Sequence, residues 1–154
     1  MNIQPNIDTF FLSLLAGLVA TLVMTVIEIP IWKRFGLRGV LEWHENQVLS
    51  TKFFRLAESE LHIKGIFLLH FVNGGLGGMG FALVLMIFPF ATSSVILAGV
   101  AYGVFLWAVT LVPIHKPITG IIPWRHPDGN LPMITSLIGH LAYGAVVGSL
   151  FIVI

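Results

Sequence analysis

Three ionisable side chains interrupt the apolar stretches of this 154-residue sequence: Glu28, His70 and His140. Such groups are costly inside a membrane, so each one indicates a functional site with a partner. Two neutral imidazoles and one carboxylate are a plausible three-ligand set for zinc, copper or iron. Two histidines on facing helices can also ligate haem axially. We therefore predict His70 and His140 as cofactor-binding residues, and all three as metal ligands, with the cofactor itself left open.

Two further interpretations of these three residues stay open. Glu28 and one histidine can form a buried pair that holds two helices in register without any ligand. Alternatively, the three groups line a pathway for protons or a small solute, because imidazole titrates near neutral pH. The sequence contains no nucleophile with a base beside it, so we name no catalytic residue. Whether the chain is an enzyme is open, and we expect none on its own.

The composition places these residues in a membrane protein. Hydrophobic residues make up 56% of the chain and charged residues 10%, with a mean hydropathy of +0.95. A soluble domain has about a quarter charged residues, which this chain lacks. The absence of cysteine excludes a disulfide scaffold and thiolate metal sites. The net charge of +1 argues against a nucleic-acid-binding protein, which needs a basic surface.

The spacing of the charges predicts an all-α fold with four transmembrane helices in a single membrane domain. Between Asp8 and Glu28 lie 19 uncharged residues, and between Lys64 and Lys116 lie 51. A span needs about 20 apolar residues, so the long stretch holds two spans, which we separate at Pro89. The predicted spans are residues 10–32, 66–88, 95–114 and 132–154.

The basic residues predict the orientation. All eight Lys and Arg lie in the connections 33–65 and 115–131, which four spans place on one side of the membrane. By the positive-inside rule, both long connections are cytoplasmic and both termini lie outside, in a multi-pass protein of the cell membrane. We interpret the histidines of these connections as hydrated interface residues. They are His44, His62, His115 and His126.

The first connection is predicted to contain an amphipathic interfacial helix. Trp43 and Phe54 are its expected anchors in the headgroup plane, and Glu45, Arg55 and Glu58 lie off or at the edge of its apolar stripe. The stripe consists of Leu41, Val48, Leu49, Phe53, Leu56, Ala57 and Leu61.

An internal repeat is visible in the four spans. The first span contains Leu15-Ala16-Gly17 and ends Pro30-Ile31-Trp32-Lys33, and the third contains Leu97-Ala98-Gly99 and ends Pro113-Ile114-His115-Lys116, with spacings that differ by one residue. The motif His-x-x-x-Gly-x-x-x-Gly starts at His70 in the second span and at His140 in the fourth. We predict two parallel repeats of a helical hairpin, residues 10–88 and 95–154, related by an axis along the membrane normal.

Small residues four positions apart share a helix face and allow close helix packing in a membrane. The predicted helix-packing positions are Gly17, Thr21, Gly74, Gly78, Gly99, Gly103, Gly144 and Gly148. The denser run over residues 73–80 has two interpretations. Packing is favoured, and the alternative is a broken helix whose carbonyl groups face a cavity.

Two short motifs carry a family resemblance. The stretches Gly17-Leu18-Val19-Ala20-Thr21-Leu22-Val23-Met24-Thr25 and Gly139-His140-Leu141-Ala142-Tyr143-Gly144 resemble motifs of small four-helix membrane proteins of unknown function in prokaryotes. The resemblance covers parts of two spans. It implies the four-helix topology and transfers no catalytic residue.

The function class expected first is a non-catalytic accessory or structural subunit of a larger membrane complex, such as a respiratory or membrane monooxygenase assembly. The absence of a soluble domain and the glycine-rich faces favour it. The alternatives are a haem- or metal-binding membrane protein that uses the paired histidines, and a small transporter or channel with Glu28 in the pathway. The expected partners are membrane lipid and other membrane subunits, with a homo-oligomer possible in principle and nucleic acid excluded.

Overall fold

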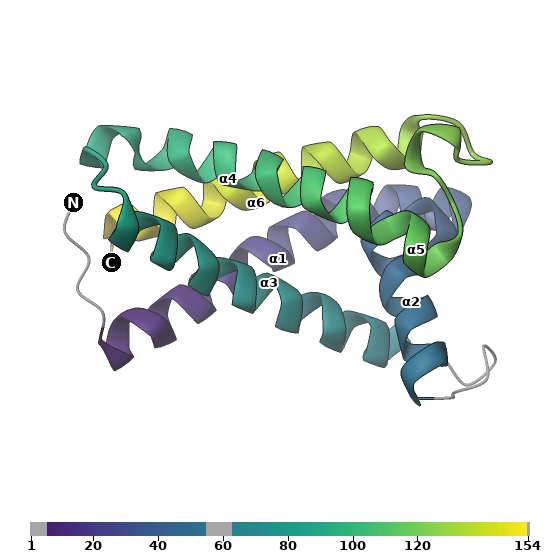
Figure 1. Ribbon diagram of the computed structural model, residues 1–154, viewed down its shortest axis with the longest axis horizontal. Coiled ribbons are helices and arrows are strands. Elements are labelled where there is room, and N and C mark those ends of the chain that lie inside the picture. Colours follow the sequence, from purple (N-terminus) through teal and green to yellow (C-terminus); the bar gives the residue numbers. More distant parts are fainter. Residues whose placement is uncertain (1–5, 55–62, 154) are drawn as a thin grey trace.

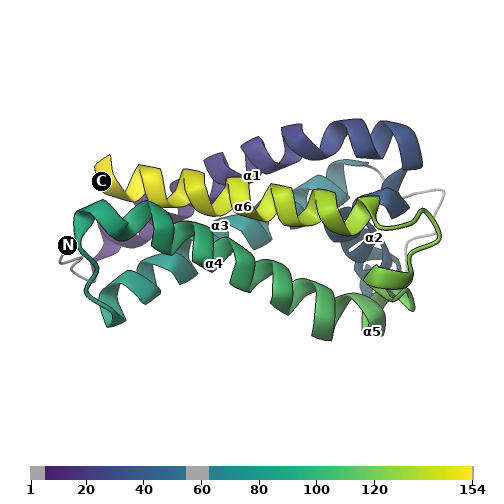
Figure 2. The ribbon, with the colours of Figure 1, turned by 90° about the horizontal axis from the view of Figure 1, so that it is seen from above.

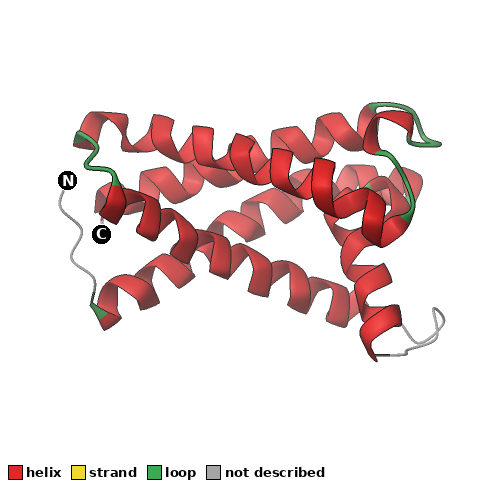
Figure 3. Ribbon diagram, in the orientation of Figure 1, coloured by secondary structure: helices red, strands yellow, loops and turns green. Residues whose placement is uncertain are grey.

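The computed structural model describes residues 6–54 and 63–153, which form helices and no strand (Figure 3). The helices are α1 (Ile7–Phe35), α2 (Leu41–Phe54), α3 (Ile63–Ile87), α4 (Val95–Val109), α5 (Lys116–Thr119) and α6 (Leu131–Val153). A π-helix over Thr110–His115 joins α4 to α5. Short 3-10 turns lie at Leu37–Gly39, Thr92–Ser94 and Pro123–Arg125.

The prediction of four spans is confirmed. In the described part of the chain, four helical stretches are long and apolar enough to cross a membrane, as in a multi-pass membrane protein. They are Ile7–Phe35, Ile66–Ile87, Thr92–Thr119 and Leu131–Val153. The break between the second and third spans also lies as expected, because α3 ends two residues before Pro89, which has no N–H to continue a helix.

The four long helices form two crossed pairs (Figure 1). Helix α1 packs against α3, α4 packs against α6, and α1 also packs against α6, which joins the pairs. Figure 2 shows the start of α1, the α3–α4 connection and the end of α6 together at one end of the bundle. Helices α2 and α5 lie at the opposite end, which we call the α2 end.

Glycines allow the two helices of each pair to pack backbone against backbone. A methyl group added at Gly17 would meet the carbonyl oxygen of Gly74, and one at Gly99 would meet the carbonyl oxygen of Gly144. On the opposite helices, Gly78 lies against the backbone of Gly17. Larger side chains at these contacts would push the helices apart, and membrane helices depend on such close packing for their association.

The glycine run of α3 packs on two sides and does not break the helix. Helix α3 is continuous through residues 63–87, so the broken-helix alternative is wrong. The hydroxyl of Tyr143 donates a hydrogen bond of 2.6 Å to the carbonyl oxygen of Gly74, and Tyr102 donates one of 2.9 Å to Gly77. Because side chains at Gly77 or Gly80 would meet these hydroxyls, the glycines also let the α4–α6 pair contact α3.

Helix α2 lies across the end of the bundle, but its orientation corrects the prediction (Figure 1). Trp43 is 1% exposed and packs edge-on against Phe67, so it is not an interfacial anchor. Glu42, Glu45 and Asn46 are also buried, on the inward side of the helix. Inward burial is possible because the bundle supplies polar partners, which such groups need away from water. Leu56, Ala57 and Leu61 of the predicted stripe, with Arg55 and Glu58, lie outside the described residues.

Candidate binding cavity

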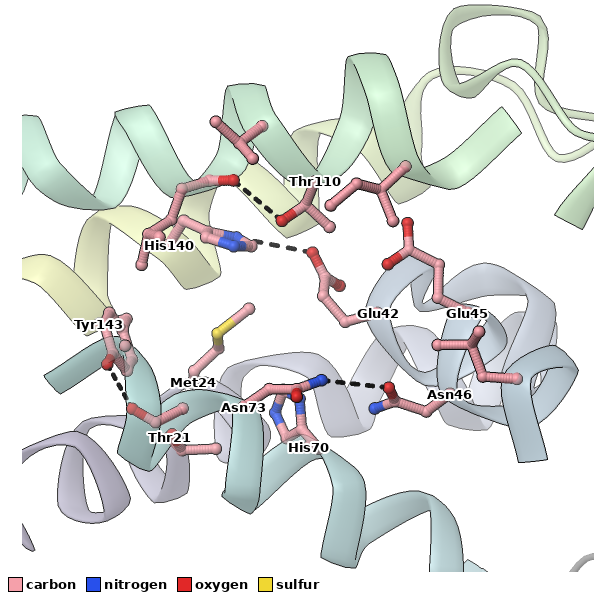
Figure 4. Close-up of a pocket in the computed structure, with 16 residues that line it drawn as sticks. Thr21, Met24, Glu42, Glu45, Asn46, His70, Asn73, Thr110, His140 and Tyr143 are labelled. Atoms are coloured by element: carbon pink, nitrogen blue, oxygen red, sulfur yellow. Dashed lines mark hydrogen bonds and ion pairs between the residues drawn. The ribbon is translucent and has the colours of Figure 1, made fainter. Parts of the chain in front are cut away.

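A cavity of about 410 Å³ lies between the two helix pairs at the α2 end (Figure 4). Its volume is within the range of about 300–1,000 Å³ that is typical of small-molecule sites. The polar lining consists of Thr21, Glu42, Glu45, Asn46, His70, Asn73, Thr110, His140 and Tyr143. The remainder is Met24, Leu49, Gly74, Gly77, Leu106, Val109 and Ile114. Every long helix contributes, so the cavity exists only in the folded bundle.

His140 and Glu42 form the first acid–imidazole pair of the cavity. The Nδ1 atom of His140 lies 2.9 Å from the carbonyl oxygen of Ser136 and 3.5 Å from Oε1 of Glu42. The hydroxyl of Ser136 donates a short hydrogen bond to the same Glu42 oxygen. Because a carbonyl oxygen only accepts, Nδ1 of His140 is the donor of the bond to Ser136.

His70 and Glu28 form a second pair in a more deeply buried position. The Nε2 atom of His70 lies 3.7 Å from Oε2 of Glu28, which is 0% exposed. Glu28 does not line the cavity, and neither of its carboxyl oxygens has a hydrogen-bond partner, although the Glu42 carboxyl group is near enough to act on it electrostatically. The two acid–imidazole pairs are therefore neighbours.

Glu45 and His115 form a third pair at the α2 end. The Nδ1 atom of His115 lies 2.8 Å from Oε1 of Glu45, and His115 is fully buried. Burial raises the pKa of Glu45 to about 7, although the hydrogen bond from His115 opposes this shift. The ring of half-buried His44 lies 6.0 Å from the His115 ring, and burial, with the nearby His115 and Arg38, lowers the pKa of His44 to about 4.

The α2 helix and the π-helix hold these groups in place. Asn73 of α3 donates a 3.4 Å hydrogen bond to Oδ1 of Asn46, which ties α2 to the α1–α3 pair. The π-helix brings Thr110 and Ile114 to the cavity wall and His115 to Glu45. A π-helix turn contains one more residue than an α-helix turn and occurs frequently at functional sites.

The predicted metal ligands Glu28, His70 and His140 lie in one region of the bundle, and metal binding by them stays a prediction. In the ranges 6–54 and 63–153, no group of three or more His, Asp or Glu side chains is arranged to hold a metal ion. Each histidine instead faces its own carboxyl group, His70 with Glu28 and His140 with Glu42. Haem ligation by the two histidines stays a prediction.

Sequence reasoning missed Glu42, Glu45 and His115, which it assigned to the membrane surface. The interpretation as hydrated residues is wrong for His115, which is fully buried, and for His126, which is 5% exposed and lies 3.1 Å from the carbonyl oxygen of Arg38. His62 lies outside the described residues. A usable signal was present, because residues 42, 45, 46 and 49 share one helix face and three of them are polar.

The cavity is lined by carboxyl and imidazole groups. No Lys or Arg of the described residues lines it, whereas two carboxyl groups do. The three pairs hold carboxyl and imidazole groups 2.8 to 3.7 Å apart. Comparison of the chain with protein-family models, curated proteins and solved structures gave no match.

Proposed function

We propose that this protein is a small membrane transporter that binds a small solute in the α2-end cavity and exchanges protons with it. The observation that carries this proposal is the two buried acid–imidazole pairs, His70 with Glu28 and His140 with Glu42, at a cavity of ligand size. Buried titratable groups inside a membrane bundle are costly, and proton relays in pumps and transporters use such groups. In this proposal Glu28 belongs to the proton pathway, and Glu42 contacts the solute.

The proposal includes an orientation. Lys33 and Arg34 lie in the last turn of α1, and the basic residues Arg38, Lys52, Lys116 and Arg125 lie between α1 and α6, all toward the α2 end. By the positive-inside rule, the α2 end, where the cavity lies, faces the cytoplasm. Both termini then lie on the outer side of the cell membrane.

The proposal also includes the internal repeat. Gly17 meets the carbonyl oxygen of Gly74 as Gly99 meets that of Gly144, which supports two equivalent hairpins. The motif spacings differ by one residue between Gly17–Pro30 and Gly99–Pro113, and the second interval contains part of the π-helix. A single insertion into an α-helix produces a π-helix turn, so the second hairpin gained one residue there. Transporters are often built from such repeats.

Proton flux into liposomes that contain the purified protein and a pH-sensitive dye tests the proposal. With an imposed membrane potential, we expect Glu28→Gln and Glu42→Gln each to lower the flux at least about tenfold, because each removes one carboxyl group of the relay. Asp128→Asn removes a carboxyl group from the same end of the bundle but outside the cavity, and serves as the matched control. Wild-type flux in both cavity variants, or no flux through the wild-type protein, would contradict the proposal.

The expectation of an accessory subunit stays a separate prediction. Its test is purification in mild detergent with identification of the proteins and cofactors that remain bound. Recovery of a stable particle near the mass of one or two chains would argue against it. An absorption spectrum of the same preparation tests haem binding.

A further inference from the structure

We infer that the solute of this cavity is a small organic ammonium ion, held at its charged end by α2 and α6 and at its apolar end by α4. The inference rests on the proposed function, because it names the substrate class of the same cavity. Four properties of the cavity carry it: its charge, its unpaired polar atoms, its acceptors and its apolar lining residues.

The charge of the lining favours a cation. Glu42 and Glu45 reach the cavity from α2, and Glu28 lies near Glu42. The described lining contains no Lys or Arg that could neutralise an anion. In a buried site of low dielectric constant, an anionic ligand next to these carboxyl groups would be repelled, whereas an ammonium ion would be attracted.

Buried polar atoms of the lining lack partners. Oε2 of Glu42 has no hydrogen-bond partner, and Nε2 of His70 has none beyond its 3.7 Å contact with Glu28, although Glu42 is 8% and His70 is 6% exposed. Buried polar groups are normally hydrogen-bonded, and an unpaired one costs free energy. Both side chains line the cavity, and Figure 4 shows the Glu42 carboxyl group extending toward His140 across it. A ligand that donates hydrogen bonds would satisfy the carboxylate oxygen of Glu42.

The acceptors of the lining suit a primary ammonium group, which has three donors. Oε2 of Glu42 is an unpaired acceptor. Glu45 and His140 also line the cavity, where Oε1 of Glu45 is bonded to His115 and Nδ1 of His140 to Ser136. Charge-assisted hydrogen bonds of this kind are stronger than those between neutral groups.

The cavity also has apolar lining residues. Leu106 and Val109 of α4 and Ile114 of the π-helix line it together with the polar residues of α2 and α3. Apolar side chains bind a hydrocarbon group by removing it from water. The ligand that fits both kinds of lining residue is therefore an alkyl ammonium ion, and a fully polar cation such as a hydrated metal ion fits less well.

Calorimetric titration of the purified protein with n-butylammonium chloride tests the inference. We expect saturable binding of n-butylammonium, and no saturable binding of 1-butanol or butyrate, which have similar size but lack the positive charge. Glu45→Gln and Glu42→Gln should each raise the Kd at least about tenfold, because each replaces a carboxyl acceptor with a neutral amide. Asp128→Asn should leave the Kd unchanged, and the elution profile of each variant reports whether it is folded.

The outcomes separate this inference from the proposed function. Equal binding of 1-butanol or preferred binding of butyrate overturns the ammonium inference, as does absence of n-butylammonium binding to folded protein. A Kd that is unchanged in both folded glutamate variants overturns it too. Proton flux in liposomes without ammonium binding retains the proposed function alone, and ammonium binding without any flux retains the inference alone.

Discussion

His115 and Glu45 are joined by a 2.8 Å hydrogen bond that links the π-helix to α2 across 70 residues of sequence. His115 is fully buried, and Glu45 is 6% exposed and lines the cavity. The bond therefore fixes α2 against the α4 side of the bundle, while the hydrogen bond between Asn46 and Asn73 fixes it against α3. The closed end of the cavity depends on both contacts.

The raised pKa of Glu45 predicts a pH dependence of stability. Burial raises this pKa from 4.5 to about 7, so in that interval the folded protein binds a proton that the unfolded chain has lost. The contribution of Glu45 to stability is complete below pH 4.5 and is lost as the pH rises through about 7. We expect the stability of wild type relative to Glu45→Gln to fall across this interval, as measured by denaturant unfolding in mixed micelles.

The lowered pKa of His44 changes stability with pH in the opposite direction and provides an internal control for this experiment. Its pKa is lowered from 6.5 to about 4, so its contribution rises with pH between these values. Glu45→Gln retains His44, and the difference between the two curves isolates Glu45. Stability curves that run parallel across the whole interval would show that the pKa of Glu45 is not raised.

The equivalent glycine contacts predict equal costs in the two helix pairs. Gly17→Ala and Gly99→Ala each place a methyl group against a backbone carbonyl oxygen, which cannot move away. We expect each variant to lose about 1–3 kcal/mol of stability, as for other overpacked contacts. Gly75→Ala is the matched control, because its methyl group meets the end of the Leu14 side chain, which can change rotamer. A loss as large in Gly75→Ala would refute the backbone-contact explanation.

The tyrosine hydroxyls predict a modest stabilisation of the contact between the helix pairs. Tyr143→Phe and Tyr102→Phe remove one hydrogen bond each, to the carbonyl oxygens of Gly74 and Gly77. These bonds join α4 and α6 to α3. Because one hydrogen bond contributes this much, we expect each variant to lose about 0.5–1.5 kcal/mol of stability. Ser149→Ala is a suitable control, since its exposed hydroxyl bonds within α6. Thermal unfolding of the three variants measures the difference.

The predicted orientation is testable by cysteine labelling, because the chain contains no cysteine. Ser93→Cys, in the α3–α4 connection, should react with a membrane-impermeant maleimide on intact cells. Asn130→Cys, at the α2 end, should react after the cells are permeabilised. This pattern follows from the basic residues of the long connections. The reverse pattern would place the cavity on the outer side.

The sequence alone determined the number of helices that can cross a membrane and the place where the second and third spans separate. Both features are local, because a span needs a fixed length of apolar residues and Pro89 interrupts a helix wherever it stands. The same is true of the glycine spacing, which puts Gly74 and Gly78 on one face of α3. The three intramembrane residues Glu28, His70 and His140 were identified in this way.

The tertiary structure decided which partners these residues meet. Charge along the chain indicated that the connection after α1 lies at the membrane surface, but it did not indicate which face of α2 turns inward. That choice depends on contacts between distant segments, namely Glu42 with Ser136 and His140, and Glu45 with His115. A buried carboxyl group is tolerated only beside such partners, and the packing of the whole bundle sets where they lie. Glu42 and Glu45 therefore entered the candidate site only when the helices were assembled.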